Sequence, residues 1–177
     1  ALPEMQVDMR LRLDPFAIDL GQVYVQSEDV TILSKGRFAA TDAGWDVAVD
    51  AEIAEVDQAG LLRLWPASAL TGPRRWMETG IPQATFSDFH LGFRKRPGAD
   101  ALVAGTYAFT DTSILYLNSM PPVIDAAGVG TFTSDMFATT LDAGRIIAPQ
   151  GGAMDVANSS LIIPDLGQSP ATVDYDL

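Results

Sequence analysis

Hydrophobic and polar residues alternate along much of this chain. The clearest stretch is residues 45–53, where odd positions are apolar and Asp46, Asp50 and Glu52 occupy even positions. Because successive side chains of a strand point to opposite faces, this period-two pattern predicts a strand with one apolar and one wetted face. Residues 89–93 alternate in the same way and predict a second strand of this kind.

Weaker alternation predicts further strands over most of the remaining sequence. Asp42-Ala43-Gly44 and Thr133-Ser134-Asp135 have the composition of hairpin turns, since Gly and Asp accept the backbone angles that such turns need. The pattern therefore predicts a mainly antiparallel all-β fold of one module over residues 1–177, with strands in 1–58 and 84–177. The weaker strands are expected at about 5–13, 16–26, 30–41, 101–109, 112–117, 128–133, 136–143, 153–157, 160–164 and 171–176.

One short helical insertion at about 65–79, within a plug segment 62–80, interrupts the strands. Pro66 suits a first helical position because its missing N–H costs nothing there. Thr71-Gly72-Pro73 is expected to break and restart the helix, and Gly80 with Pro82 to end it. The apolar side chains of this plug are expected to cover one end of the sheet: Trp65, Leu70, Trp76 and Met77.

An internal match relates residues 32–53 to residues 124–145 at an offset of 92 residues. Two similar hairpins would produce such a match, and so would a repeated supersecondary unit stacked along one axis. The sequence leaves both explanations open. The matched positions are Gly36 with Gly128, Thr41 with Thr133, Trp45 with Phe137, and Asp50-Ala51 with Asp142-Ala143.

Composition narrows the classes of function. The 177 residues suit one domain, and a hydrophobic content of 47% argues against disorder. A net charge of −12 opposes binding to nucleic acid, which requires a basic surface. The absence of cysteine excludes disulfides, thiolate catalysis and zinc–sulfur sites. The sequence shows no apolar window of about 18 residues, and it shows no export signal, so any export signal is expected outside these residues.

No pattern indicates catalysis, a metal or a cofactor. His90 lies near Ser87 and Asp88, but adjacent strand positions point to opposite faces, so the three side chains cannot form a catalytic triad. The acidic residues of 46–52 lack the spacing of a calcium loop and are interpreted as the wetted face of a strand. Glycine-rich phosphate loops are missing as well.

A family resemblance rests on the order of several short motifs. The run LRLWP, RRWMETGI and ATFSDFHLGFR is followed by FTDTSILYLNSMPPVIDAAGVGTFTSDMFATTLDAGRI. Together with Met120-Pro121-Pro122 and Ile163-Pro164-Asp165, these motifs resemble the YhdP-like central domain of the AsmA-like superfamily, the repeating β-groove proteins of the Gram-negative envelope that include TamB and YhdP. The resemblance covers about Gly36 to Leu177.

The resemblance implies an open, twisted sheet curled into a trough with an apolar lining. It implies a non-enzymatic, cofactor-free module of a periplasmic protein that is anchored in the inner membrane and moves phospholipid toward the outer membrane. It further implies that this chain is a fragment of a longer repeat protein, with flanking repeats and the membrane anchor outside it. Phospholipid acyl chains are then the expected partner, and an exposed edge strand is expected to permit dimerisation in isolation.

The alternating strands supply the residues of the expected groove. The residues expected to line the groove are Trp45, Val47, Val49, Ile53, Phe89, Leu91, Phe93, Phe137 and Leu141.

The basic residues are unevenly placed along the chain. Six of eleven lie between positions 63 and 96, where they are expected either to pair with surface acids or to contact anionic headgroups. The candidates for headgroup or partner contacts are Arg74, Arg75, Arg94, Lys95 and Arg96.

Alternation alone does not separate an open groove from a closed core, because both need one apolar face per strand. The alternative is therefore a passive structural or protein-docking β-domain whose apolar residues fill a closed core. A carbohydrate-active β-sandwich enzyme is a third class, but no pair of acidic residues is singled out as its catalytic pair.

Overall fold

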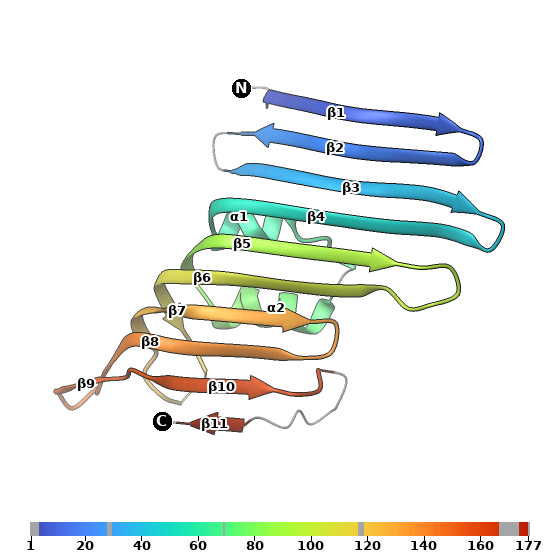
Figure 1. The fold of residues 1–177 in the computed structure, drawn as a ribbon. Coiled ribbons are helices and arrows are strands. Elements are labelled where there is room, and N and C mark those ends of the chain that lie inside the picture. Colours follow the sequence, from blue (N-terminus) through green and yellow to red (C-terminus); the bar gives the residue numbers. More distant parts are fainter. Residues whose placement is uncertain (1–3, 28–29, 69, 117–118, 167–173, 177) are drawn as a thin grey trace.

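The computed structural model describes all residues except 1–3, 28–29, 69, 117–118, 167–173 and 177 (Figure 1). The described residues form eleven strands and two helices. The strands are β1 (Glu4–Leu13), β2 (Phe16–Gln26), β3 (Thr31–Thr41), β4 (Gly44–Asp57), β5 (Gln83–Lys95), β6 (Leu102–Ile114), β7 (Val123–Thr133), β8 (Phe137–Ile147), β9 (Ala153–Asp155), β10 (Ser159–Ile163) and β11 (Asp174–Asp176); the helices are α1 (Gln58–Leu64) and α2 (Thr71–Gly80).

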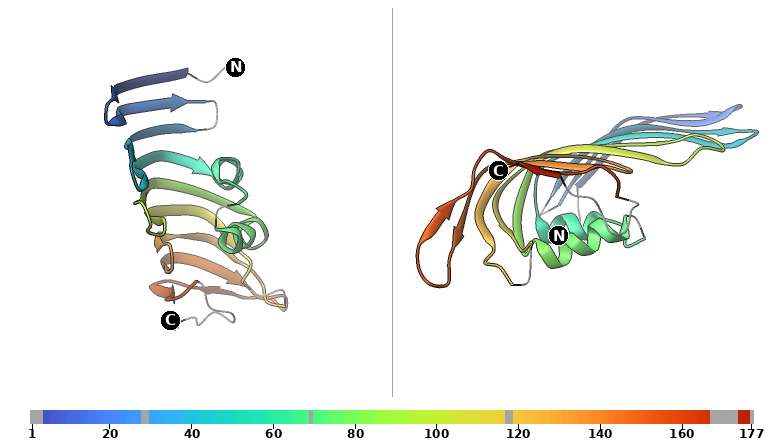
Figure 2. Two further views of the ribbon diagram at one scale, coloured as in Figure 1. Left: turned by 90° about the vertical axis from the view of Figure 1, so that its right-hand side faces the viewer. Right: turned by 90° about the horizontal axis from the view of Figure 1, so that it is seen from below.

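The strands form one antiparallel sheet in which neighbours in sequence are neighbours in space. The order is β1-β2-β3-β4-β5-β6-β7-β8-β10-β11, and β9 pairs with β8 beside this path. Since β1 and β11 lie at opposite ends, the sheet is open, as the family resemblance implied. Figure 2 shows the sheet curving around the two helices, with β1 to β3 extending beyond them.

The expected helical insertion is present between β4 and β5 and consists of two helices, of which α1 lies before the expected residues 65–79. Asp57 starts α1 earlier than expected, because its side chain accepts a hydrogen bond of 2.6 Å from the Gly60 N–H. Pro66 follows α1 and does not open a helix. It disfavours the helical backbone for the preceding residue, and Trp65 accordingly ends α1 in an extended conformation.

The second helix begins and ends where the sequence predicted. It starts at Thr71, carries Pro73 in its first turn, and stops at Gly80. Arg74 fastens it to α1, since its guanidinium donates to the carbonyl oxygens of Leu62 and Trp65, each at 3.3 Å. These carbonyls lie at the end of α1 and have no partner within a helix.

Three aspartates introduce bulges into the central strands. Asp88 in β5, Asp111 in β6 and Asp125 in β7 adopt left-handed backbone angles, with φ of 49°, 50° and 52°. Such angles are more accessible to Asp than to bulkier residues. At each aspartate the pairing with a neighbouring strand shifts in register. A bulge adds one residue to the strand, so apolar residues on either side of it share a face although they are three positions apart in sequence.

The bulges correct two strand predictions. Residues 101–109 and 112–117 were expected as separate strands, but Asp111 only interrupts the alternation within the continuous strand β6. In the same way, Asp125 interrupts the alternation in the first half of β7. This strand begins at Val123 and not at the expected residue 128.

Aromatic rings of β6 and β7 lie over glycines of the opposing strand. A Cβ atom added to any of these glycines would collide with the ring that covers it. Glycine at these positions therefore leaves room for rings to lie flat on the sheet. The directly opposed pairs are Tyr107 with Gly130, Phe109 with Gly128, and Phe132 with Gly105.

The internal match extends to backbone geometry. The offset of 92 residues that relates Gly36 to Gly128 also relates all of β3 to all of β7. Gly36 lies opposite Val49 and Gly128 lies opposite Leu141, so the two hairpins share one register. A Cβ at either glycine would collide with a backbone carbonyl of the following strand. The two hairpins thus share their register and this close approach, although β7 has the bulge at Asp125 and β3 has none.

We expect Gly128→Ala to destabilise the fold by about 2–3 kcal/mol, because overpacking would force β7 away from the Thr140 carbonyl and displace Phe109. Gly92→Ala is the matched control, since its added methyl group would meet nothing closer than Asp50 Oδ1 at 3.6 Å. It should change the free energy of unfolding by less than about 0.5 kcal/mol. Urea denaturation measures both, and equal effects would contradict the packing described for Gly128.

Candidate functional site

Strand register places the nine predicted groove residues on one face of the sheet. Directly opposed residues of antiparallel strands share a face, so the face can be followed from strand to strand. Val49 of β4 lies opposite Phe93 of β5, and the register through β6 and β7 carries the same side to Phe137 and Leu141 of β8. This side, the apolar face, carries Trp45, Val47, Val49, Ile53, Phe89, Leu91, Phe93, Phe137 and Leu141.

The helices cover part of the apolar face and form a closed core there. Ile53 and Phe89 are only 8% and 9% exposed and pack in one cluster with Leu61 of α1 and Ile81 after α2. Leu91 and Leu141 pack against the same cluster, and Phe137 meets the Trp76 ring of α2 edge-on at 6.4 Å. The buried members of this covered region are Ile53, Val56, Leu61, Ile81, Ala84, Phe86, Phe89, Phe109, Val123 and Ala126.

Tyr107 is partly buried and packs against the covered region. Its ring stacks on Phe89 at 6.0 Å and meets Phe86 edge-on at 5.6 Å. Burial raises the pKa of its hydroxyl well above the usual 10.0, against the smaller opposing effect of a hydrogen bond with Thr139. Its phenol therefore stays neutral beside the cluster.

The plug residues divide between the cluster and its margin. Trp65 and Met77 pack against the cluster, as expected of a cover over the sheet. Leu70 lies just before α2, with a left-handed backbone at φ 47°. Trp76 is 44% exposed, and its ring meets that of Phe137 of β8.

The remaining apolar face has no second layer among the described residues. Trp45 is 53% exposed, and Val47, Val49 and Phe93 lie outside the covered cluster. In β1, five apolar side chains on this face are between 46% and 77% exposed. We call this surface the open face; it comprises Met5, Val7, Met9, Leu11, Leu13, Phe16, Ile18, Leu20, Val23, Val25, Phe38, Trp45, Val47, Val49 and Phe93.

Sequence reasoning missed the contribution of β1 and β2 to the open face. The signal was present, because residues 4–13 read EMQVDMRLRL, in which every odd position is apolar. Their register with β2 and β3 continues the face from Trp45 to the sheet edge. At the hairpin ends, the rings of Phe16 and Trp45 meet edge-on at 6.0 Å.

The opposite side of the N-terminal strands is charged, as the alternation predicted. Asp50 and Glu52 lie there opposite Gly92 and His90. Asp50 pairs with Arg94 at 2.6 Å, and Glu52 lies 3.8 Å from His90. The sheet is therefore amphipathic over β1 to β5, with one wetted side and one apolar side.

The basic residues proposed for headgroup contacts do not converge. Arg94 belongs to the charged side, whereas Lys95 lies opposite Val47 on the apolar face and donates to the Ala99 carbonyl. Arg74 is occupied by the carbonyls at the end of α1 and by Glu78. Arg75 on α2 and Arg96 after β5 are exposed. Of the five, Lys95 is the one that the strand register places on the side of the open face.

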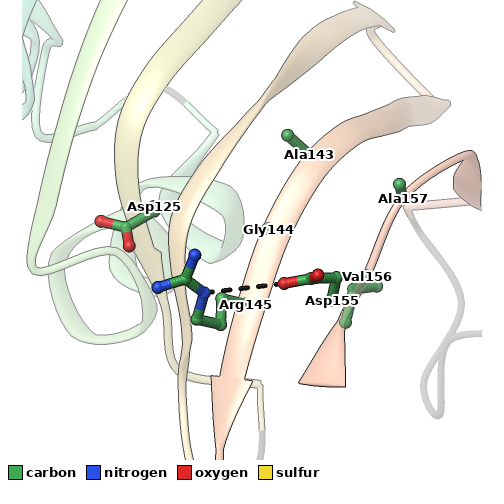
Figure 3. A pocket seen from close by; sticks show the side chains of 7 residues that line it. All are labelled: Asp125, Ala143, Gly144, Arg145, Asp155, Val156 and Ala157. Atoms are coloured by element: carbon green, nitrogen blue, oxygen red, sulfur yellow. Dashed lines mark ion pairs between the residues drawn. The ribbon is translucent and has the colours of Figure 1, made fainter. Parts of the chain in front are cut away.

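Two shallow hollows lie on the side away from the helices. The smaller, of about 210 Å³, is lined by residues of β7 to β9 and the segment after β9, and Arg145 Nε lies there 3.6 Å from Asp155 Oδ1 (Figure 3). Asp125 lies on the other side of the same guanidinium. The larger, of about 510 Å³, is lined mainly by small threonine, alanine and glycine residues. Within the described residues, no group of three or more His, Cys, Asp or Glu side chains is placed to bind a metal.

In the part of the chain that the structure describes, no helix has the length and apolar character needed to span a membrane. Comparisons with protein-family models, curated proteins and solved structures give no match to this chain. The amphipathic sheet and its uncovered apolar residues are therefore the features of this chain that bear on its function.

We expect Ile53→Asp and Val49→Asp to differ sharply although both residues lie on the same face of β4. Ile53 is enclosed by the cluster, so an unpaired carboxylate there should cost about 4 kcal/mol of the free energy of unfolding. Val49 is partly exposed outside the cluster, and water can solvate its replacement, so the cost should be about 1 kcal/mol. Urea denaturation would contradict the division of the apolar face if both variants lost the same stability.

Proposed function

We propose that this chain is a non-enzymatic module that holds phospholipid acyl chains on its open face. In this proposal it belongs to a periplasmic protein that is anchored in the inner membrane and carries phospholipid toward the outer membrane. The observation that carries the proposal is the row of exposed apolar side chains from β1 to β5, on a sheet whose other side is charged. The resemblance to the YhdP-like domain supports the same conclusion.

The hydrophobic effect supplies the physical reason. Each methylene exposed to water costs about 0.8 kcal/mol, so a sixteen-carbon tail in water costs on the order of 10 kcal/mol. An apolar sheet face removes much of this cost while a headgroup stays wet. The effect has no preferred direction, which lets a tail slide from one strand to the next without a strong binding site.

The covered region constrains the path of such a lipid. Strands lie about 4.8 Å apart, so the open face from β1 to β5 spans roughly 20 Å. Beyond β5, α1 and α2 occupy the apolar face between the sheet and solvent. A tail would therefore lie against the β1 to β3 surface and the hairpin-side half of β4 and β5, where Trp45 and Phe93 are found.

The covered region also favours the second candidate, a structural or protein-docking module. The cluster beneath the helices is a closed core and by itself accounts for the burial of Ile53, Phe89 and their neighbours. In that case the open face would contact another protein surface in place of lipid. The two functions differ in whether acyl chains bind to the isolated chain.

Native mass spectrometry of gently purified protein tests this difference. We expect bound phospholipid on the wild-type chain and at least about tenfold less on Val49→Asp, because a carboxylate on the path must be desolvated by a tail. Leu33→Asp is the matched control, since Leu33 lies opposite Glu52 on the charged side and is 38% exposed. It should retain lipid.

Transfer of a fluorescent phospholipid between vesicles should follow the same order of variants. Leu91→Arg is less suitable than Val49→Asp, because Leu91 packs against the covered cluster and its loss would also perturb folding. Wild-type protein free of lipid and inactive in transfer would reject the lipid proposal. Equal lipid on wild type and Val49→Asp would reject the open face as its location.

A further inference from the structure

The first strand is a long edge of the sheet in this chain. β1 has ten residues, all exposed, and pairs on one side only, with β2. Proteins commonly guard such edges with charged side chains, proline, bulges or very short strands, and of these β1 has only the charges. The shift between β1 and β2 arises from an extra residue in β2, since Asp8 lies opposite Gln22 and Met9 opposite Leu20, and β1 itself stays regular.

The charges of β1 are ordered along the strand. On its polar side the N-terminal half is acidic, with Glu4 and Asp8, and the C-terminal half is basic, with Arg10 and Arg12. An antiparallel partner of the same sequence would therefore bring acid opposite base. The apolar side chains at the odd positions would simultaneously meet apolar side chains of the copy.

Among the registers that satisfy both sides, the one centred on Met9 pairs the most residues: it pairs nine, whereas a register centred on Val7, which sets Glu4 against Arg10, pairs seven. With Met9 opposite Met9 of the second copy, each Asp8 faces an Arg10, and each Val7 faces a Leu11. If the pairing is instead centred one residue earlier, Asp8 lies opposite Asp8 of the second copy. If it is centred one residue later, Arg10 lies opposite Arg10. Directly opposed like charges are unfavourable, so the pairing centred on Met9 is selected.

The ion pairs within the chain agree with this register. Arg12 is already engaged with Asp19 of β2 at 3.0 Å. Among the described residues, Asp8 and Arg10 form no ion pair, although they lie at the middle of the strand. Asp8 and Arg10 are thus able to meet across the edge, whereas Glu4, which also forms no ion pair among the described residues, accepts a hydrogen bond from Gln6.

We propose that in the isolated 177-residue chain β1 pairs antiparallel with β1 of a second copy, with Met9 opposite Met9, to form one continuous sheet. The arrangement is a closed twofold contact, since the same edge serves both copies. The opposite edge is formed by β11, whose three residues offer little for head-to-tail assembly. Because the two sheets join edge to edge, their open faces lie on the same side. The inference stands on β1 alone and does not depend on lipid binding.

Single-cysteine cross-linking tests the register directly, because the natural chain contains no cysteine. Met9→Cys should form covalent dimers with a short bifunctional thiol reagent. Val7→Cys should react with itself at least tenfold more slowly, since its two copies would be offset by four residues, or about 13 Å. Mixing Val7→Cys with Leu11→Cys should restore rapid cross-linking. All three side chains are exposed in the single chain, so folding is preserved.

Charge reversal tests the same contact without covalent trapping. Asp8→Arg or Arg10→Asp alone should weaken dimerisation at least tenfold in sedimentation experiments, and the double variant Asp8→Arg/Arg10→Asp should recover it. A monomer at all concentrations, with no cross-linking of Met9→Cys, would overturn the proposal. Faster self-cross-linking of Val7→Cys than of Met9→Cys, or failure of the double variant to recover, would overturn the register.

Discussion

A single-layered sheet needs a second layer to bury its apolar face, and here two short helices provide that layer for only part of the sheet. The hydrophobic effect makes exposed apolar area costly, so the extent of the helical cover determines where the chain has a core and where it has a surface. Beneath α1 and α2 the residues around Phe86 and Phe109 exclude water. Beyond the helices, the same alternation leaves Met9 and Trp45 exposed.

The covered region has features that the open region lacks. Left-handed aspartates shift the register of β5, β6 and β7, and rings of β6 and β7 lie flat over glycines. Both features let the sheet bend and pack closely around the helices. The first three strands contain none of these left-handed aspartates among their described residues and continue past the helices (Figure 2). One chain therefore combines a closed core beneath the helices with the exposed apolar residues of the open face.

Much of the strand pattern followed from the sequence, because a period of two fixes both the strand and the side to which each residue points. The faces of β4 and β5, the hairpins at Asp42 and Ser134, and the start and end of α2 were all predicted correctly. The left-handed aspartates were missed because they break the alternation that defines a strand. Asp57 acting as a helix cap was missed because it follows a strand without an intervening loop.

The candidate site was predicted less completely, for a different physical reason. Alternation shows which side of a strand is apolar, but coverage depends on where distant helices pack. Ile53 and Val49 therefore have the same signature in the sequence, although one lies in a core and the other on a surface. The basic residues near position 95 are adjacent in sequence yet point to opposite sides, so their clustering did not produce a common rim.

Fluorescence of Trp45 offers the most direct test of the claim that acyl chains lie on the open face. In a Trp65→Phe/Trp76→Phe variant Trp45 is the sole remaining tryptophan, since the chain contains three. Phospholipids with brominated tails should quench its emission, while the same lipids without bromine should shift the emission to shorter wavelength. Emission that both lipids leave unchanged, in a variant that folds normally, would contradict the account.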